Sequence, residues 1–368
     1  MQDSFDVIVI GAGAIGAACG RELAAGGRRV LILDQAQSKG EAWRAAAGML
    51  APQVEAGPED PLFQLAVAGR ERYVELAPAL KETTGVDIGL WLDGIARVAN
   101  RAEDAAELRA RVAWQRQQGH LCDWFDPAEI KARYPWLGPS FGALWAPRDG
   151  ALDPVALVTA LRADTERLGA RIERAQALRL CRDGDRIIGV EAGEKFMAEH
   201  VVVAAGAWSA RIGALPRPIS VEPVRGQMAA LPWPEGIEPA IVHGGGCYML
   251  ARAGEAIVGS TMEYAGYETE TTSAGLASIF AGVSALCPAL ATLAVTRTWA
   301  GLRPVTPDGL PIIGAEPRAS GLWYATGHGR NGILLAAITG AIIRDLIDGK
   351  APAAEGLAAV SPERFWRW

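Results

Sequence analysis

The chain has 368 residues, of which 50% are hydrophobic and 21% are charged, and its formal net charge is -6. A single core stops growing at about 250–300 residues, so this length predicts two domains or one domain with a large insertion. The negative charge, the absence of a basic run and the absence of a long apolar stretch argue against nucleic acid or a membrane as a partner.

The cysteines lie far apart and form no C-x-x-C pair. Their odd number and wide spacing argue against a disulfide framework or a zinc site, so we expect no metal and a reducing compartment. The N-terminus carries Asp6 where an export signal would be basic, and the cytoplasm is therefore the expected location.

The first 34 residues predict a strand, a helix and a second strand. An apolar run at 5–10 is followed by an Ala-rich segment at 15–25 and a second apolar run at 30–33. This order is typical of a βαβ unit with buried parallel strands. The glycine-rich turn before the helix is a G-x-G-x-x-G that consists of Gly11, Ala12, Gly13, Ala14, Ile15 and Gly16.

Asp34 follows the second strand, 18 residues after Gly16. In this context the motif predicts a dinucleotide site, with the pyrophosphate at the helix N-terminus and a ribose hydroxyl bound to Asp34. The alternative for Asp34 is an ordinary surface carboxylate. The motif alone fits NAD as well as FAD.

The rest of the chain mixes two kinds of pattern. Helices are predicted at 62–83, 156–168 and 333–347, and buried strands at 201–205 and 323–326. The region 86–150 is rich in tryptophan, and 216–300 contains short alternating runs such as 221–231 and 248–260, which suggest an antiparallel sheet. The predicted class is therefore mixed α/β, with parallel βα elements interleaved with antiparallel strands.

Two further segments rich in small residues suit close contact with a cofactor. Residues 45–50 read Ala-Ala-Ala-Gly-Met-Leu, where small side chains let backbone N–H groups approach a flat ring. Residues 327–332 read Gly-His-Gly-Arg-Asn-Gly between a strand and a helix, whose N-terminus favours negative charge on a reduced flavin. The alternatives are close helix packing for the first segment and a simple connection for the second.

Arg303 and Tyr248 are the candidate substrate residues. Arg303 stands among apolar neighbours, and a buried guanidinium needs a partner such as the carboxylate of a substrate. An internal Asp or Glu partner is the alternative. Tyr248 begins a predicted strand, where its phenol either points into a pocket or forms part of the core.

Together these motifs resemble the D-amino-acid oxidase family of FAD enzymes, and within it the glycine oxidase branch of thiamine biosynthesis. The resemblance extends from Asp6 to about Asp348. It is carried by VIVIGAGAIGAA (7–18), AAAGMLAP (45–52), VVVAAGAWS (201–209), CYMLAR (247–252), VGSTM (258–262), WAGLRP (299–304) and GHGRNGILLA (327–336).

The resemblance implies a Rossmann-like FAD-binding domain from residues 1–90, 146–218 and 304–368, with an interleaved antiparallel-sheet substrate domain from 91–145 and 219–303. It implies that the substrate contacts Arg303, Tyr248, Arg330 and Met262. It implies that FAD contacts the motif glycines, Ala14, Ile15, Asp34, Gln35, Ala47, Gly48, Met49, Leu178, His328, Gly329, Arg330, Asn331, Gly332, Ile333 and Leu334.

Three features bear on the cofactor and the pocket. Glu41 to Arg44 stand where the family often has small hydroxylated residues, and Gly244 to Gly246 stand where a histidine near the pocket is familiar. This second run predicts a mobile glycine loop. Related sarcosine oxidases attach FAD through a cysteine, but no cysteine follows Cys287, so we expect noncovalent FAD.

The implied reaction transfers a hydride from Cα of glycine, sarcosine or a small D-amino acid to flavin N5, and oxygen then yields hydrogen peroxide. The imine hydrolyses to glyoxylate and ammonia, or enters thiamine biosynthesis. The alternatives are a D-amino-acid oxidase, a dehydrogenase that passes electrons to another carrier, and a non-enzymatic dinucleotide-binding sensor. The family also implies a homotetramer.

Overall fold

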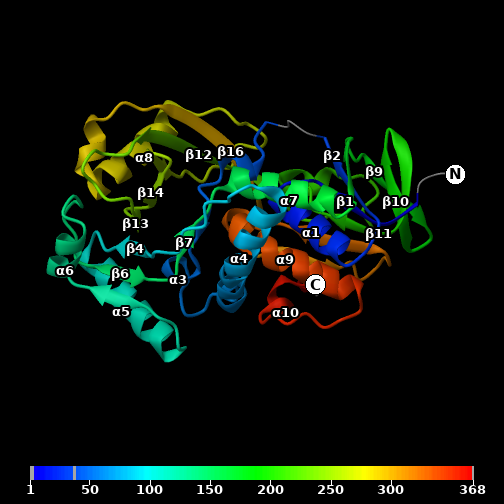
Figure 1. Cartoon of the computed structure of the whole chain (residues 1–368), viewed down its shortest axis with the longest axis horizontal. Coiled ribbons are helices and arrows are strands. Elements are labelled where there is room, and N and C mark those ends of the chain that lie inside the picture. Colours follow the sequence, from blue (N-terminus) through cyan, green and yellow to red (C-terminus); the bar gives the residue numbers. More distant parts are fainter. Residues whose placement is uncertain (1–3, 36–38, 367–368) are drawn as a thin grey trace.

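The computed structural model describes residues 4–35 and 39–366, and two large sheets organise it (Figure 1). The first sheet has the order β17-β18-β11-β1-β2-β8, and the hairpin β9–β10 extends from β11. Its strands are β1 (Ser4–Ile10), β2 (Val30–Asp34), β8 (Arg171–Arg174), β9 (Arg179–Asp183), β10 (Arg186–Ala192), β11 (Glu194–Val203), β17 (Ile312–Ala315) and β18 (Leu322–Thr326).

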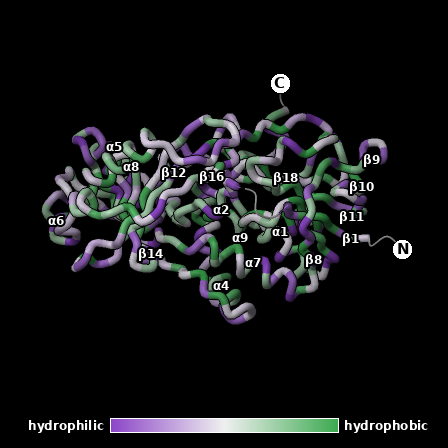
Figure 2. Tube along the Cα trace, turned by 90° about the horizontal axis from the view of Figure 1, so that it is seen from above, coloured by the Kyte–Doolittle hydropathy of each residue, from purple (hydrophilic) through white to green (hydrophobic). Residues whose placement is uncertain are grey.

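The centre of the first sheet is parallel and buried on both faces. Residues 7–10 of β1 are all buried and pair in parallel with β2 and β11. Val7 and Val9 pack against a layer that includes α1 (Ala14–Ala25) and α9 (Gly332–Ile347), whereas Ile8 and Ile10 pack toward the hairpin β9–β10. Figure 2 shows the hydrophobic segments of β1 and β11 close to α1. The strands are continuous apolar runs because neither face meets water.

The second sheet has the order β16-β12-β15-β14-β13-β4-β6-β5 and is antiparallel except between β13 and β4. Its longest pairing joins β12 to β16 along nine residue pairs. The strands are β4 (Ile95–Val98), β5 (Asp123–Phe125), β6 (Ala143–Ala146), β12 (Glu222–Pro232), β13 (Ile241–Gly244), β14 (Cys247–Arg252), β15 (Glu255–Gly259) and β16 (Arg297–Val305). A small third sheet pairs β3 (Met49–Leu50) with β7 (Gly150–Ala151).

The helices divide between the two sheets (Figure 1). Those near the first sheet are α1, α4 (Phe63–Thr84), α7 (Pro154–Arg167), α9 and α10 (Leu357–Val360). Those near the second are α5 (Ala102–Gln117), α6 (Pro127–Arg133) and α8 (Ser273–Leu286), and the short α2 (Ala42–Ala45) and α3 (Pro52–Glu55) lie in the segment that follows β2. In the described part of the chain, no helix is both long and apolar enough to cross a membrane.

The predicted mixed α/β class is confirmed, and one predicted strand begins earlier than expected. The strand expected at 201–205 spans Glu194 to Val203, because its first residues pair with the hairpin strand β10. The run 248–260 forms two strands, β14 and β15, joined by a tight turn at Ala253 and Gly254. The first sheet takes strands from 4–34, 171–203 and 312–326, and the second from 95–146 and 222–305. The domain boundaries themselves stay a prediction.

Candidate active site

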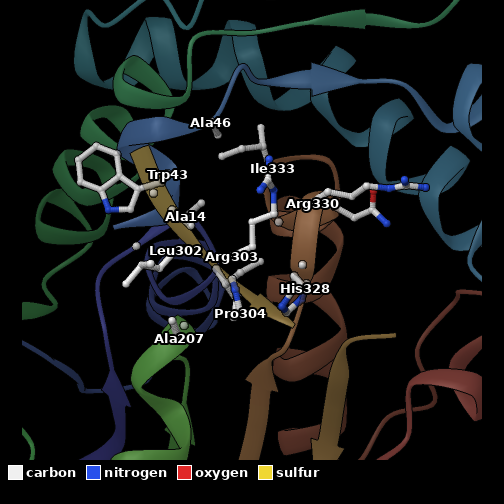
Figure 3. A pocket seen from close by; sticks show the side chains of 18 of the residues that line it. Ala14, Trp43, Ala46, Ala207, Leu302, Arg303, Pro304, His328, Arg330 and Ile333 are labelled. Atoms are coloured by element: carbon white, nitrogen blue, oxygen red, sulfur yellow. The ribbon is translucent and has the colours of Figure 1, made fainter. Parts of the chain in front are cut away.

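A cavity of about 1180 Å³ lies between the two sheets. It is larger than the roughly 300–1,000 Å³ of ordinary small-molecule pockets, as a dinucleotide requires. Its lining comes from the starts of α1 and α9, the segment around 41–62 and strands of the second sheet. Figure 3 shows Ala14 and Trp43 at one side of this space, and Arg303, His328 and Arg330 at the other.

The glycine-rich turn brings the start of α1 to the cavity. Gly11 has a φ of +101°, and a Cβ there would lie 2.6 Å from the carbonyl oxygen of Ala204. A Cβ at Gly16 would lie 1.8 Å from the carbonyl oxygen of Gly11, so this glycine lets the helix pack against the turn. The helix has no side-chain cap, and its first N–H groups therefore face the cavity near Gly13, as an anion site requires.

Asp34 lies at the carboxyl end of β2, beside this turn. Its Oδ2 accepts a hydrogen bond of 2.6 Å from the N–H of Ala12, and a guanidinium nitrogen of Arg162 lies 3.8 Å away. Asp34 and Gln35 line the cavity, which continues past Ala175 to Ala177. This arrangement suits the ribose end of a dinucleotide.

Residues 45–49 form the opposite wall, and side chains of the second sheet hold their carbonyl groups. Nε1 of Trp299 donates to the Ala45 carbonyl at 3.2 Å, and Arg252 donates to the carbonyls of Ala47 and Leu152. Gly48 has a φ of +83°, and a Cβ there would lie 2.1 Å from the carbonyl oxygen of Leu152. The small-residue segment is therefore a shaped loop beside the cavity, which leaves room for a flat ring.

The second glycine loop leads from β18 into α9. His328 in this loop is 2% exposed, its Nε2 lies 3.1 Å from Oγ1 of Thr339, and burial lowers its pKa to about 3. The hydroxyl of Tyr73 donates to the Ile333 carbonyl at 2.5 Å, which fixes the first turn of α9. No side chain caps this helix, so its N-terminus presents backbone N–H groups to the cavity.

Arg303 on β16 projects its guanidinium into the cavity (Figure 3). Nη1 donates to the Thr261 carbonyl at 3.0 Å and Nη2 to Oγ of Ser260 at 2.6 Å. Within residues 4–35 and 39–366, the structure has no ion pair between this guanidinium and an Asp or Glu. Burial lowers the pKa of Arg303 below its ordinary value, yet the group stays cationic at neutral pH. The site therefore holds a buried cation that is not directly paired with a carboxylate of the described residues.

Four further side chains line the end of the cavity that Arg303 enters: Tyr248, His243, Glu55 and Arg330. Burial raises the pKa of Tyr248 to about 12, so its phenol is neutral, and its oxygen lies 3.2 Å from Sδ of Met228. His243 stacks on Tyr248, and burial with nearby Arg97 lowers its pKa to about 3. Arg330 pairs with Glu55 at 2.9 Å.

Sequence reasoning missed Glu55 and His243, although both line the cavity. An acidic residue in the largely apolar segment 49–56 was a signal for Glu55. The cross-strand register of His243 with Tyr248 was a weaker one.

The structure brings together nearly all of the residues predicted from the sequence. Met262 lines the rim and is 64% exposed. Leu178 lies outside the cavity lining, and its N–H and carbonyl pair with Glu191 and Gly213 at 2.8 Å each. The lining includes Gly11, Gly13, Ala14, Ile15, Asp34, Gln35, Ala47, Gly48, Met49, Tyr248, Met262, Arg303, His328, Gly329, Arg330, Asn331, Gly332, Ile333 and Leu334.

Two segments, 41–44 and 244–246, differ in sequence from the family pattern, and the structure shows how each is arranged. Trp43 lines the cavity, whereas Glu41 pairs with Arg44 at 2.6 Å. The glycine run forms a tight turn at Gly245 and Gly246 between β13 and β14, with both residues at positive φ.

Comparisons with known proteins agree with this geometry. The family model described as DAO, FAD dependent oxidoreductase, matches residues 6–346. A glycine oxidase from Geobacillus kaustophilus is 34% identical over 96% of this chain and 95% of its own length. The crystal structure of glycine oxidase from Geobacillus kaustophilus superposes with a TM-score of 0.93 at 34% identity, covering 98% of both chains.

A longer relative, the bifunctional protein ThiO/ThiG from a Nostoc species, is 33% identical over 93% of this chain and 52% of its own length. The chain thus spans about half of that protein. The match covers most of the described elements, from β1 to α9.

Proposed function

Because the chain belongs to the DAO family of FAD-dependent oxidoreductases, we propose that it oxidises glycine, and also sarcosine and small D-amino acids, with oxygen as the electron acceptor. The products are the imine or glyoxylate, ammonia and hydrogen peroxide, and the pathway served is thiamine biosynthesis. The glycine oxidase relatives support this substrate, and the ThiO/ThiG relative supports the pathway. The observation that carries the proposal is the buried guanidinium of Arg303, which has room for a carboxylate.

The residues of the cavity fit FAD. The uncapped start of α1 suits the pyrophosphate, Asp34 suits a ribose, and the walls formed by 45–49 and 328–334 suit the flavin. Bound FAD supplies a two-electron oxidant for the Cα–H bond. In the described part of the chain no cysteine lines the cavity, which supports noncovalent attachment.

The side chains at the Arg303 end of the cavity bind and orient the amino acid. Arg303 holds the carboxylate by two parallel hydrogen bonds, and the neutral phenol of Tyr248 bounds the space next to it. The guanidinium of Arg303 disfavours an ammonium group nearby and so promotes the neutral amine that forms the imine, whereas the charge of Arg330 is balanced by Glu55. His243 and His328 are neutral and weakly basic, and the amine therefore loses its proton to water.

The deciding experiment is the visible spectrum of the purified protein before and after glycine is added without oxygen. We expect the flavin to be bleached, and hydrogen peroxide to appear in air. Activity should fall with bulky D-amino acids and be absent with L-amino acids. An unbleached flavin would refute the proposal, peroxide-free turnover would indicate a dehydrogenase, and a strong preference for D-alanine or D-proline would move the chain to another branch.

A further inference from the structure

The indole of Trp43 carries a hydrogen-bond donor that the protein leaves unused. The side chain is 8% exposed and lines the cavity. Its Nε1–H is buried and meets no acceptor among residues 4–35 and 39–366. A buried donor without a partner destabilises the fold, so this N–H is expected to have a use in the complete holoprotein.

The position of the indole indicates what that use is. A Cβ at Gly13 would lie 3.4 Å from Cδ1 of Trp43 and 3.9 Å from its Nε1, so the edge that carries the N–H faces the start of α1. Gly13 is the N-cap residue of this helix and supplies no side-chain cap. Figure 3 shows Trp43 and Ala14 at the same side of the cavity. The donor thus adds to the free backbone N–H groups of the helix N-terminus.

Two arginine side chains lie beside this donor, Arg44, which pairs with Glu41, and Arg162, which lies near Asp34. The Cζ atom of Arg44 lies 4.1 Å from the centroid of the Trp43 ring, and that of Arg162 lies 5.4 Å away. Nε of Arg162 also donates to the Ala12 carbonyl at 2.7 Å, which fixes this cation beside the glycine-rich turn. A negatively charged acceptor gains most from an N–H in such a place.

We propose that the indole N–H of Trp43 donates a hydrogen bond to the pyrophosphate of FAD. Trp43 then replaces, with an aromatic donor, the small hydroxylated residues expected near this position. The proposal adds one residue of this chain to the cofactor site and is independent of the substrate. Its test therefore succeeds or fails separately from the test of glycine oxidation.

The matched pair of variants is Trp43→Phe and Trp124→Phe. Nε1 of Trp124 is also buried without a partner in the described residues, and Cζ of Arg109 lies 4.7 Å from its ring, but Trp124 does not line the cavity. Both substitutions replace the indole and its N–H by a smaller phenyl ring, so the loss of side-chain volume is common to the pair. The dissociation constant for FAD is measured from the fluorescence of flavin released when the holoprotein is diluted.

We expect Trp43→Phe to raise the dissociation constant about 10-fold to 100-fold, since a hydrogen bond to a charged group is lost. Trp124→Phe should leave it within about twofold of the wild type. With saturating FAD, the visible spectrum of Trp43→Phe should equal that of the wild type, because the walls at 45–49 and 328–334, and not Trp43, would hold the flavin ring. An unchanged dissociation constant, or an altered flavin spectrum, would overturn the proposal.

A second measurement serves if Trp43→Phe does not fold. The full-length wild-type protein is labelled with ¹⁵N in its indole groups, freed of flavin and titrated with ADP or with adenosine. ADP carries a pyrophosphate without a flavin. One indole N–H resonance should move downfield with ADP and stay in place with adenosine. Equal responses to both, or none, would refute the assignment.

Discussion

The guanidinium of Arg303 lies directly over Gly226 of the neighbouring strand: a Cβ at Gly226 would stand 2.0 Å from Nη1. Gly226 pairs with Gly301 on β16, two residues before Arg303. The missing side chain makes the space in which the guanidinium reaches the cavity. The placement of the Arg303 guanidinium therefore depends on a neighbouring residue that has no side chain.

Gly226→Ala should displace the guanidinium of Arg303 and lower kcat/KM for glycine. Contacts this short force the side chain to move, and a misplaced binding group costs roughly 100-fold in rate. FAD content should stay near that of the wild type, because Gly226 lies at the substrate end. Gly57→Ala is the control, since nothing lies within 4 Å of a Cβ there. Equal kcat/KM for the two variants would contradict the role of Gly226.

Arg303→Ala should lower kcat/KM for glycine by roughly 30-fold to several thousand-fold. Loss of one partner from a buried charged pair costs about 2–5 kcal/mol, at about 1.4 kcal/mol per tenfold. Arg303→Lys should recover part of the loss, because an ammonium restores the charge but not the two-pronged geometry. Activity on a simple amine without a carboxylate should change much less. Unchanged kcat/KM on glycine would show that Arg303 does not bind the carboxylate.

Asp149→Ala should destabilise the protein by about 3–5 kcal/mol, because it breaks the buried ion pair with Arg70, whose remaining carboxylate partner is the more exposed Glu71. Asp149 also accepts hydrogen bonds from the N–H groups of Gln53 and Val54, at 3.0 and 2.9 Å. Urea unfolding measures the change. Asp87→Ala removes an exposed partner of Lys81 and should matter far less. Equal losses of stability in the two variants would exclude a special role for the buried pair.

The free energy of unfolding should fall as the pH drops below 6.5, and His328 should account for part of that fall. The unfolded chain binds a proton on this ring near pH 6.5, whereas burial lowers the folded pKa of His328 to about 3. Its contribution is complete above pH 6.5 and is lost progressively as the pH falls toward 3. At pH 5 one such ring costs about 2 kcal/mol.

His328→Asn should therefore reduce the pH dependence of urea unfolding between pH 7 and pH 5. His200→Asn is the control, because His200 is only partly buried and sits at the edge of Trp323. Its effect on the slope should be smaller. A wild-type slope in His328→Asn would mean that the ring is protonated in the folded protein.

The parts of the fold that the sequence predicts well are those with strong local patterns. The turn at 11–16 and the run of β1 are such parts, because a strand buried on both faces has few other ways to fold. The start of β11 was missed because residues 194–200 mix charged and apolar side chains, and their strand partner, the hairpin strand β10, is known only from the fold. Local periodicity carries no information on such a partner.

The same division applies to the candidate site. Arg303 was predicted because a charged residue within an apolar segment is unusual and can be recognised from the local sequence alone. Glu55 and His243 escaped because their burial arises only when α3 and β13 meet the rest of the cavity. Leu178 lies outside the cavity lining, and the pairing of its backbone with Glu191 and Gly213 was not visible in the sequence.

The hydrogen bonds that Arg252 and Trp299 donate to the carbonyl groups of Ala47 and Ala45 limit how this protein can be re-engineered. Both donors come from the second sheet, which an engineer would exchange to obtain a new substrate, while the loop they hold is one that we propose binds the cofactor. A chimera that keeps every cofactor motif but takes its second sheet from another oxidase must carry an arginine and a tryptophan at these two places. Without these two donors, the carbonyl groups of Ala45 and Ala47 lose their hydrogen bonds to the second sheet, and the cavity wall at 45–48 changes its shape.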